Sequence, residues 1–178
     1  MLVVTDVQNG FVREQSAHIV SIIVALVQDW QRSGGDILFT RYINYPDSPF
    51  ERFFGWRRMQ SPPETEVVPE LKPFLSYGTV IDKTIYSPFT DKGAKLVEER
   101  GWTDLYFCGI ATESRVLKGA VDAFERNLTP WLIADASASH AGEEAHAAGL
   151  LVARRFIDPG QVITRAQIPP TLTIGRYK

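Results

Sequence analysis

Asp6, Lys83 and Arg115 are the residues whose types and placement best suit chemistry, because each follows an apolar segment typical of a buried strand. A carboxylate can accept a proton and return it, and a neighbouring lysine lowers the pKa of a thiol nucleophile. Arg115 cannot itself act as a nucleophile, because its guanidinium is always protonated in proteins and has no lone pair to offer. The trio therefore contains a proton-transfer group and two cations, without an attacking group.

The elements that must position these residues alternate between strand-like and helix-like segments. Apolar, β-branched runs predict strands, and apolar residues at helical spacing predict helices. The predicted strands are 1–5, 36–40, 80–83, 104–108 and 131–134, and residues 162–164 are expected to add an edge strand. The predicted helices are 16–33, 91–100, 113–127 and 142–155, the last with Leu150, Leu151 and Val152 on its apolar side.

This alternation predicts an α/β fold, a single-domain three-layer α/β/α sandwich with a mainly parallel, Rossmann-like sheet, over residues 1–178. In open α/β sheets, ligands bind beyond the carboxyl ends of the strands. Asp6 ends the first predicted strand, Lys83 ends the third, and residues 109–115 follow the fourth. We therefore expect the three charged residues to converge at one edge of the sheet.

Three segments of the sequence resemble the isochorismatase-like cysteine hydrolases. Residues 109–118 follow the family pattern Gly, apolar, any, Thr, acidic, any, Cys, Val, except that Arg115 stands at the position of the nucleophilic cysteine. Residues 3–11, which include Asp6, and residues 82–89, which include Lys83, resemble the segments that supply the family's aspartate and lysine. The resemblance extends from about residue 1 to about residue 165.

The resemblance implies that Asp6, Lys83 and position 115 form the catalytic group, in which the family's cysteine hydrolyses amides and related C–N bonds through a thioester. It also implies an oxyanion hole of backbone N–H groups around Ala111 and Arg115, next to a peptide bond that is often cis in this family. The predicted substrate-binding residues are Phe11, Tyr42, Ala111 and Arg115.

Arginine at position 115 excludes hydrolysis through a thioester. Its positive charge also requires a negatively charged partner. A cation at the amino end of a helix is disfavoured by about 0.3 to 1 kcal/mol at exposed sites, so Arg115 needs a nearby anion. We expect its guanidinium to fork onto the Asp6 carboxylate and to leave the trio with one net positive charge. In the alternative, a slip in the register of the following helix leaves Arg115 exposed.

Ser114 and Cys108 are the other candidate nucleophiles, and both are disfavoured. Neighbouring helix residues point about 100 degrees apart, so Ser114 is expected to face away from the pocket that position 115 lines. Cys108 lies on an apolar strand, where a free cysteine usually behaves as a small buried hydrophobe. Neither residue is expected to replace the missing thiol.

The sequence predicts neither a metal site nor a cofactor. His18, His140 and His146 lack a compact ligand pattern with nearby carboxylates. The Asp-x-His element that resembling nicotinamidases place after the second strand reads Arg41-Tyr42-Ile43 here. His140 is expected to have a structural role in the loop before the last helix.

The long segment Arg41–Gly78 is rich in turns, aromatic residues and arginines. Loops of this length inside compact domains are usually functional, as lids or partner surfaces. The alternative is an aromatic cluster that packs beneath a surface loop or in a dimer interface. We expect a homo-oligomer in which this segment and the helix from residue 113 make the contacts.

The charge and hydropathy of the chain exclude several classes of binding partner. The 178 residues carry 19 basic and 21 acidic side chains, a net charge of -2, and no long basic run, so nucleic acid is not an expected partner. The most apolar stretch, Ile19–Val27, is far shorter than the roughly 20 residues of a membrane span. One cysteine and no secretion signal at the start favour the reducing cytoplasm.

Two functions follow from these observations. The first is an isochorismatase-like protein that has lost thiol-dependent hydrolysis and either binds a small anionic ligand or serves as a structural subunit. The second is an active hydrolase of C–N or vinyl ether bonds that uses Asp6 and Lys83 without a thiol. The resemblance includes isochorismatases that protonate a vinyl ether from the aspartate, and an Asp6 carboxyl with a raised pKa would serve as that acid.

Overall fold

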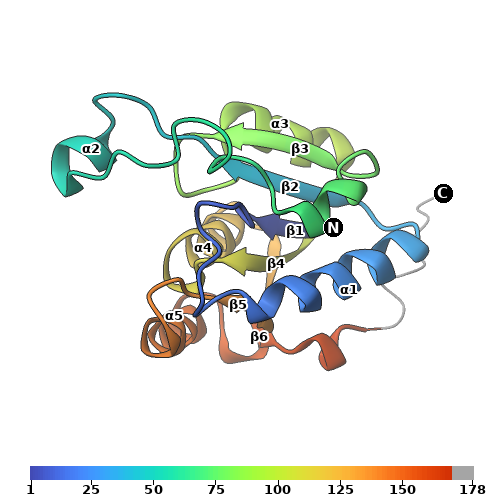
Figure 1. Ribbon diagram of the computed structural model, residues 1–178. Helices are drawn as coiled ribbons and strands as arrows, with labels where there is room; N and C mark the ends of the chain where they lie inside the picture. Colours follow the sequence, from blue (N-terminus) through green and yellow to red (C-terminus); the bar gives the residue numbers. More distant parts are fainter. Residues whose placement is uncertain (170–178) are drawn as a thin grey trace.

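A parallel sheet forms the centre of the protein, as seen in the computed structural model, which describes residues 1–169 (Figure 1). Residues 170–178 of the predicted domain lie outside this description. The strands are β1 (Leu2–Thr5), β2 (Ile37–Tyr42), β3 (Thr79–Lys83), β4 (Asp104–Ile110), β5 (Thr129–Ala138) and β6 (Val162–Ile163). They follow the order β3-β2-β1-β4-β5-β6, and each neighbouring pair is parallel. The predicted α/β fold with a Rossmann-like sheet is confirmed, and β6 is the predicted edge strand.

The four predicted helices form where the sequence places apolar residues at helical spacing, although the one predicted at 113–127 is an α-helix only over Leu117–Glu125; the helix Pro49–Phe54 is not among the predicted ones. Helix α3 illustrates the local signals, since the Thr90 side chain accepts a hydrogen bond from the Gly93 N–H at its start and Gly101 ends it with a left-handed φ of 64°. No helix within residues 1–169 is long and apolar enough to cross a membrane. The helices are α1 (His18–Arg32), α2 (Pro49–Phe54), α3 (Asp91–Arg100), α4 (Leu117–Glu125) and α5 (Glu143–Phe156).

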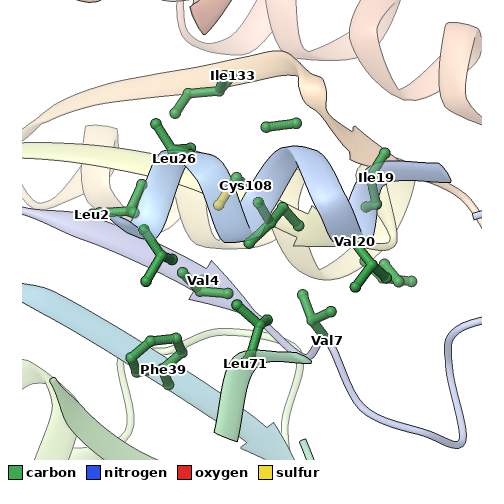
Figure 2. Close-up of a cluster of buried hydrophobic side chains, with 14 of the residues drawn as sticks. Leu2, Val4, Val7, Ile19, Val20, Leu26, Phe39, Leu71, Cys108 and Ile133 are labelled. Atoms are coloured by element: carbon green, nitrogen blue, oxygen red, sulfur yellow. The ribbon is translucent and has the colours of Figure 1, made fainter. Parts of the chain in front are cut away.

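Helix α1 covers one face of the sheet, and α3, α4 and α5 cover the other (Figure 1). Alternate residues of a strand point to opposite faces, so β1 contributes to two cores. Leu2 and Val4 pack against α1 in the first core, where Cys108 is also buried (Figure 2). Val3 belongs to the second core, together with Ala120 of α4 and Ala153 of α5. The expected three layers are therefore present.

Helix α5 forms as predicted, and Leu150 of its predicted apolar side packs against the second core, but Leu151 and Val152 do not. Leu151 is 63% exposed and Val152 is 38% exposed, whereas Gly149 and Ala153 are buried. These small residues allow a close approach to the segment after β4, and the side chains of Leu151 and Val152 turn towards solvent. A Cβ atom added at Gly149 would lie 2.7 Å from the backbone N and Cα atoms of Glu113.

The substitution Gly149→Ala tests this close contact. An alanine normally stabilises a helix relative to glycine by about 1 kcal/mol. Here we expect the free energy of unfolding to fall by about 1–3 kcal/mol, because the new methyl group meets the backbone of Glu113. Chemical denaturation of the two proteins measures the difference, and a gain in stability would contradict the packing of α5 described above.

Gln8 anchors the long segment between β2 and β3 to the body of the protein. Its side-chain Nε2 donates hydrogen bonds to the carbonyl oxygens of Tyr42 (3.0 Å) and Thr65 (2.8 Å). Its Oε1 accepts a hydrogen bond from the Tyr42 N–H at 2.8 Å. Residue 8 follows β1, so this amide holds both the beginning and the middle of the long segment against the end of the central strand.

The tip of this segment, which includes α2, projects from the body of the protein (Figure 1). Phe50 and Trp56 pack against Tyr42, with ring centroids 5.2 and 6.0 Å away, so part of the segment forms the expected aromatic cluster. Phe53 and Phe54 remain 79% and 74% exposed. Exposed apolar groups of this size are typical of contact surfaces, and the role of the segment in a homo-oligomer stays a prediction.

Candidate functional site

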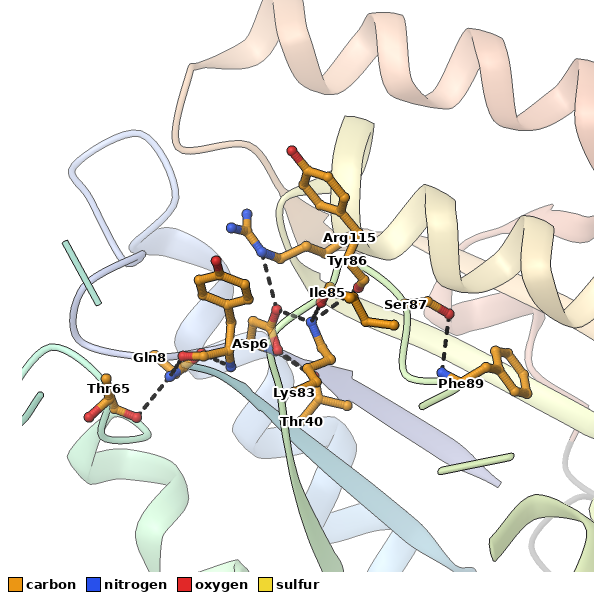
Figure 3. A network of polar contacts seen from close by, with 11 residues as sticks. Asp6, Gln8, Thr40, Thr65, Lys83, Ile85, Tyr86, Ser87, Phe89 and Arg115 are labelled. Carbon is orange, nitrogen blue, oxygen red and sulfur yellow. Dashed lines mark hydrogen bonds and ion pairs between the residues drawn. The ribbon is translucent and has the colours of Figure 1, made fainter. Parts of the chain in front are cut away.

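The three charged residues singled out in the sequence meet beyond the carboxyl ends of the central strands (Figure 3). Asp6 directly follows β1, Lys83 is the last residue of β3, and Arg115 lies in a wide helical turn, Thr112–Val116, that follows β4. Lys83 Nζ lies 2.6 Å from Asp6 Oδ2, and Arg115 Nε lies 3.3 Å from the same oxygen. The expected convergence of the trio is therefore observed.

Asp6 and Lys83 form a fully buried ion pair with several supporting contacts. Thr40 donates its hydroxyl to Asp6 Oδ1 and accepts a hydrogen bond from the Asp6 N–H at 3.2 Å. The ammonium group of Lys83 also donates to the carbonyl oxygens of Ile85 and Tyr86, each at 3.1 Å. Burial lowers the pKa of Lys83, while the Asp6 carboxylate acts in the opposite direction. These contacts fix both side chains in one arrangement.

Arg115 is buried, with 5% of its surface exposed, so the alternative of an exposed helix arginine does not hold. The expected fork onto Asp6 is also wrong, since only Nε approaches the carboxylate. Thr40 donates to Oδ1 of Asp6 and Lys83 donates to Oδ2. The terminal nitrogens of Arg115 point away from Asp6 (Figure 3).

Aromatic rings surround the guanidinium group. Its central carbon lies 4.1 Å from the ring centroid of Phe11, 5.1 Å from that of Tyr42 and 5.6 Å from that of Tyr86. Such contacts attract a cation to the negative faces of the rings. Burial lowers the pKa of Arg115 and the Asp6 carboxylate opposes this, although an arginine stays protonated in proteins. The rings and Asp6 together compensate for the loss of water around Arg115.

A cavity of about 410 Å³ opens in front of Arg115. Phe11 and Arg115 line it, as expected for two of the predicted ligand-binding residues. Tyr42 and Ala111 are fully buried and do not line it, and Tyr42 contacts the site through the Arg115 guanidinium. The lining residues are Gly10, Phe11, Arg13, Phe50, Phe54, Trp56, Tyr86, Glu113, Ser114, Arg115 and His140.

Ser114 lines this cavity beside Arg115, so the expectation that it faces away is wrong. The expectation assumed the spacing of a regular α-helix, whereas Thr112–Val116 forms a wider π-type turn. The Ser114 hydroxyl makes no hydrogen bond to another side chain within residues 1–169, and the contacts of Asp6 there are with Thr40, Lys83 and Arg115. Ser114 thus has no side-chain hydrogen-bond partner within residues 1–169 that positions it as a nucleophile.

The turn after β4 has the local geometry that the resemblance implies. The peptide bond between Ile110 and Ala111 is cis. The Ala111 carbonyl accepts hydrogen bonds from the N–H groups of Ser114 and Val116, both at 3.2 Å. Cys108 lies before this turn with its Sγ 3.6 Å from the Val3 carbonyl, and burial raises the pKa of its thiol. Cys108 is thus the expected buried hydrophobe.

Glu113 and His140 are site residues that the sequence did not indicate. Ser139 donates its hydroxyl to Glu113 Oε1 at 2.9 Å, and Glu113 Oε2 has no hydrogen-bond partner within residues 1–169. His140 lies in the loop before α5, as expected, and its ring stacks on Phe11 at 6.0 Å. Burial, followed by the charge of Arg115, lowers the pKa of His140, which favours the neutral ring.

No group of three or more His, Cys, Asp or Glu side chains within residues 1–169 is arranged to hold a metal ion. Arg41, at the position of the metal-binding aspartate in resembling nicotinamidases, instead pairs with Asp82, with nitrogen–oxygen distances of 2.7 and 2.9 Å. That ion pair ties the ends of β2 and β3 together beside the site.

The strand order and the position of the cavity place the chain among the doubly wound α/β proteins. A sequence model of the isochorismatase domain matches residues 1–167, and the chain therefore belongs to the isochorismatase family. A comparison with curated proteins returned no match.

Solved structures of similar fold include several hydrolases. An isochorismatase-like hydrolase from Alkaliphilus metalliredigens has a TM-score of 0.81 at 21% identity, over 93% of this chain and 94% of its own. N-carbamoylsarcosine amidase from Thermoplasma acidophilum has a TM-score of 0.79 at 23% identity, over 95% and 97%. Nicotinamidase from Bacillus subtilis has a TM-score of 0.79 at 26% identity, over 92% and 98%. The first two likenesses concern the fold alone.

Proposed function

We propose that this protein binds a small anionic ligand in the cavity in front of Arg115, and that thiol-dependent hydrolysis is lost. The observation that carries the proposal is the orientation of the Arg115 guanidinium. Its Nε lies 3.3 Å from Asp6 Oδ2, and its terminal nitrogens point away from Asp6 (Figure 3). A planar guanidinium with two such N–H groups matches the geometry of a carboxylate.

The position of Asp6 and Lys83 supports binding over catalysis. Both side chains are fully buried, and neither lines the cavity, because Arg115 and its aromatic neighbours lie between the ion pair and the open space. A general acid or base must come within hydrogen-bond reach of the group that it protonates or deprotonates. The alternative, an active hydrolase of C–N or vinyl ether bonds through Asp6 and Lys83, requires Arg115 to move aside.

Two arginine substitutions test the proposal with benzoate as the probe. Arg115→Gln removes the charge that faces the cavity, and Asp6 keeps Lys83 as its partner at 2.6 Å, so the fold is expected to persist. Hydrogen bonds between charged groups contribute about 1.5–3 kcal/mol, so we expect benzoate to bind roughly 10- to 150-fold more weakly. Isothermal titration calorimetry measures the change.

Arg13→Gln is the matched control, because Arg13 also lines the cavity but is exposed to solvent. An exposed cation contributes little to a specific contact, so we expect less than about a threefold change in benzoate affinity. Equal losses in the two variants would indicate general attraction to positive charge, and unchanged binding in Arg115→Gln would contradict the proposal. Turnover of isochorismate or an amide by the unmodified protein would favour the alternative.

A further inference from the structure

The wall of the cavity contains two opposite charges with unused hydrogen-bonding capacity. The terminal nitrogens of Arg115 point away from Asp6 (Figure 3), and Glu113 Oε2 has no hydrogen-bond partner within residues 1–169. The two residues are two positions apart in the wide turn after β4, and the charge of Glu113 acts on Arg115. Both line the cavity. A ligand in front of Arg115 therefore also meets a carboxylate.

A ligand that carries only a negative charge satisfies one half of this arrangement. Its carboxylate pairs with Arg115, but it is repelled by Glu113 and leaves Glu113 Oε2 without a hydrogen bond, which is unfavourable in a partly buried site. A ligand that also carries an ammonium group supplies three N–H donors for Glu113 Oε2, which is buried in the unliganded protein and reaches the ligand when the Glu113 side chain turns towards the cavity. The ligand carboxylate then faces Arg115, and the ligand ammonium group faces Glu113.

We propose that the ligand of this cavity is a small zwitterion, whose carboxylate binds Arg115 and whose ammonium group binds Glu113. This inference rests on the proposed anion binding at Arg115. It adds the chemical class of the ligand and gives Glu113 a role in selecting that class.

The remaining lining suits both the ammonium group and a flat apolar portion. Phe11 and Trp56 are stacked with their planes 17° apart, and Phe50 lies edge-on to Trp56 at 5.8 Å. Aromatic faces attract ammonium groups and also cover flat apolar groups. His140 adds a buried Nδ1 without a partner within residues 1–169, which is a further contact for an N–H donor when the ring is neutral. The volume of about 410 Å³ fits a small molecule.

Two series of three compounds test the inference by calorimetry on the unmodified protein. In the first series, phenylalanine is compared with 3-phenylpropanoate, which lacks the ammonium group, and with 2-phenylethylamine, which lacks the carboxylate. In the second series, 4-(aminomethyl)benzoate is compared with 4-methylbenzoate and 4-methylbenzylamine. The charges are close together in the first zwitterion and a ring apart in the second, so the test does not depend on one spacing.

We expect the zwitterion of at least one series to bind at least about tenfold more tightly than both of its singly charged analogues. In Glu113→Gln, the zwitterion is expected to lose this advantage, while the affinity of the carboxylate analogue is unchanged or increases. In Arg115→Gln, the zwitterion and the carboxylate analogue both weaken. Far-UV circular dichroism and thermal unfolding confirm that the variants are folded.

The outcomes separate the inference from the proposed function. If the carboxylates bind as tightly as the zwitterions in both series, and Arg115→Gln weakens them, the zwitterion inference is wrong and anion binding stands. If the amine binds as tightly as its zwitterion in both series, the inference is wrong as well. If none of the six compounds binds at millimolar concentration, both the inference and the proposed anion binding are overturned.

Discussion

Lys83→Met is expected to lower the free energy of unfolding by about 3–5 kcal/mol, because it leaves the buried Asp6 carboxylate without its nearest cation. The 3.3 Å contact with Arg115 Nε remains, but that atom forms no hydrogen bond with Asp6. The carbonyl oxygens of Ile85 and Tyr86 also lose their donor. For a chain of this length the loss corresponds to a fall of roughly 6–20 °C in the melting temperature, measured by calorimetry.

Lys95→Met is the matched control, since it removes a lysine of the same kind from an exposed pair. Lys95 Nζ lies 3.6 Å from Glu99 Oε1, and its side chain is 74% exposed. Exposed pairs of this type contribute about 0.3–0.5 kcal/mol, so the control should be nearly unchanged. The double variant Asp6→Asn with Lys83→Met removes both charges and should recover part of the lost stability. Similar losses in Lys83→Met and Lys95→Met would refute a structural role for the buried pair.

The convergence of Asp6, Lys83 and Arg115 could be predicted because it depends on regular features of the chain. Each residue lies at or just after the end of a strand, and the strands could be located from short apolar, β-branched runs. Parallel strands present their carboxyl ends at one edge of the sheet, so the order of elements already determines which side chains meet. The resemblance of residues 109–118 to the family pattern also led to the prediction that Arg115 stands at the position of the family cysteine.

The resemblance placed Phe11 and Tyr42 at the site with Arg115, but their packing against its guanidinium and the contribution of Tyr86 could not be predicted, because they depend on contacts between distant segments. Phe11, Tyr42 and Tyr86 come from three separate parts of the chain, and no periodic pattern relates them. Thr40 gave a weaker signal: it ends the second predicted strand, as Asp6 ends the first, and that position alone could have marked it as a neighbour. Glu113 occupies the acidic position of the family pattern, but the pattern does not indicate that its Oε2 lacks a hydrogen-bond partner within residues 1–169.

Two predictions, for Ser114 and for part of the apolar side of α5, were wrong for the same reason. Both assumed the geometry and packing of a regular α-helix, and the actual segments differ from it. Ser114 reaches the cavity because the turn after β4 is wider than a regular α-helix. Leu151 and Val152 are exposed because Gly149 brings α5 against the backbone of Glu113, so the buried side of the helix follows its small residues. A hydropathy scale predicts that leucine and valine are buried in preference to glycine. In α5 the close packing of two backbones buries Gly149 and leaves Leu151 and Val152 exposed.

Substitution of Arg115 gives the second large effect, because Asp6 and Lys83, the other two residues of the predicted catalytic group, lie next to it. Asp6 and Lys83 remain paired at 2.6 Å, and Arg115 Nε shows that a side chain at this position reaches Asp6. Removing the guanidinium also clears the space between Asp6 and the cavity. A cysteine sulfur is attached two bonds nearer the backbone than Arg115 Nε, and we expect it to face the Asp6–Lys83 pair, where the Lys83 cation lowers the pKa of the thiol and favours the reactive thiolate.

We therefore expect Arg115→Cys to hydrolyse an amide such as nicotinamide or N-carbamoylsarcosine at least about 100-fold faster than the unmodified protein, measured as ammonia release. A second readout needs no substrate. Alkylation by iodoacetamide should be fast at pH 7, and the background from Cys108 is low, because that thiol is buried and its pKa is raised. Arg115→Ala clears the same space without a thiol and should stay inactive, as should Arg115→Cys combined with Asp6→Asn. A thiol that alkylates only above about pH 8.5, together with no ammonia release, would mean that Asp6 and Lys83 cannot activate a nucleophile at this position.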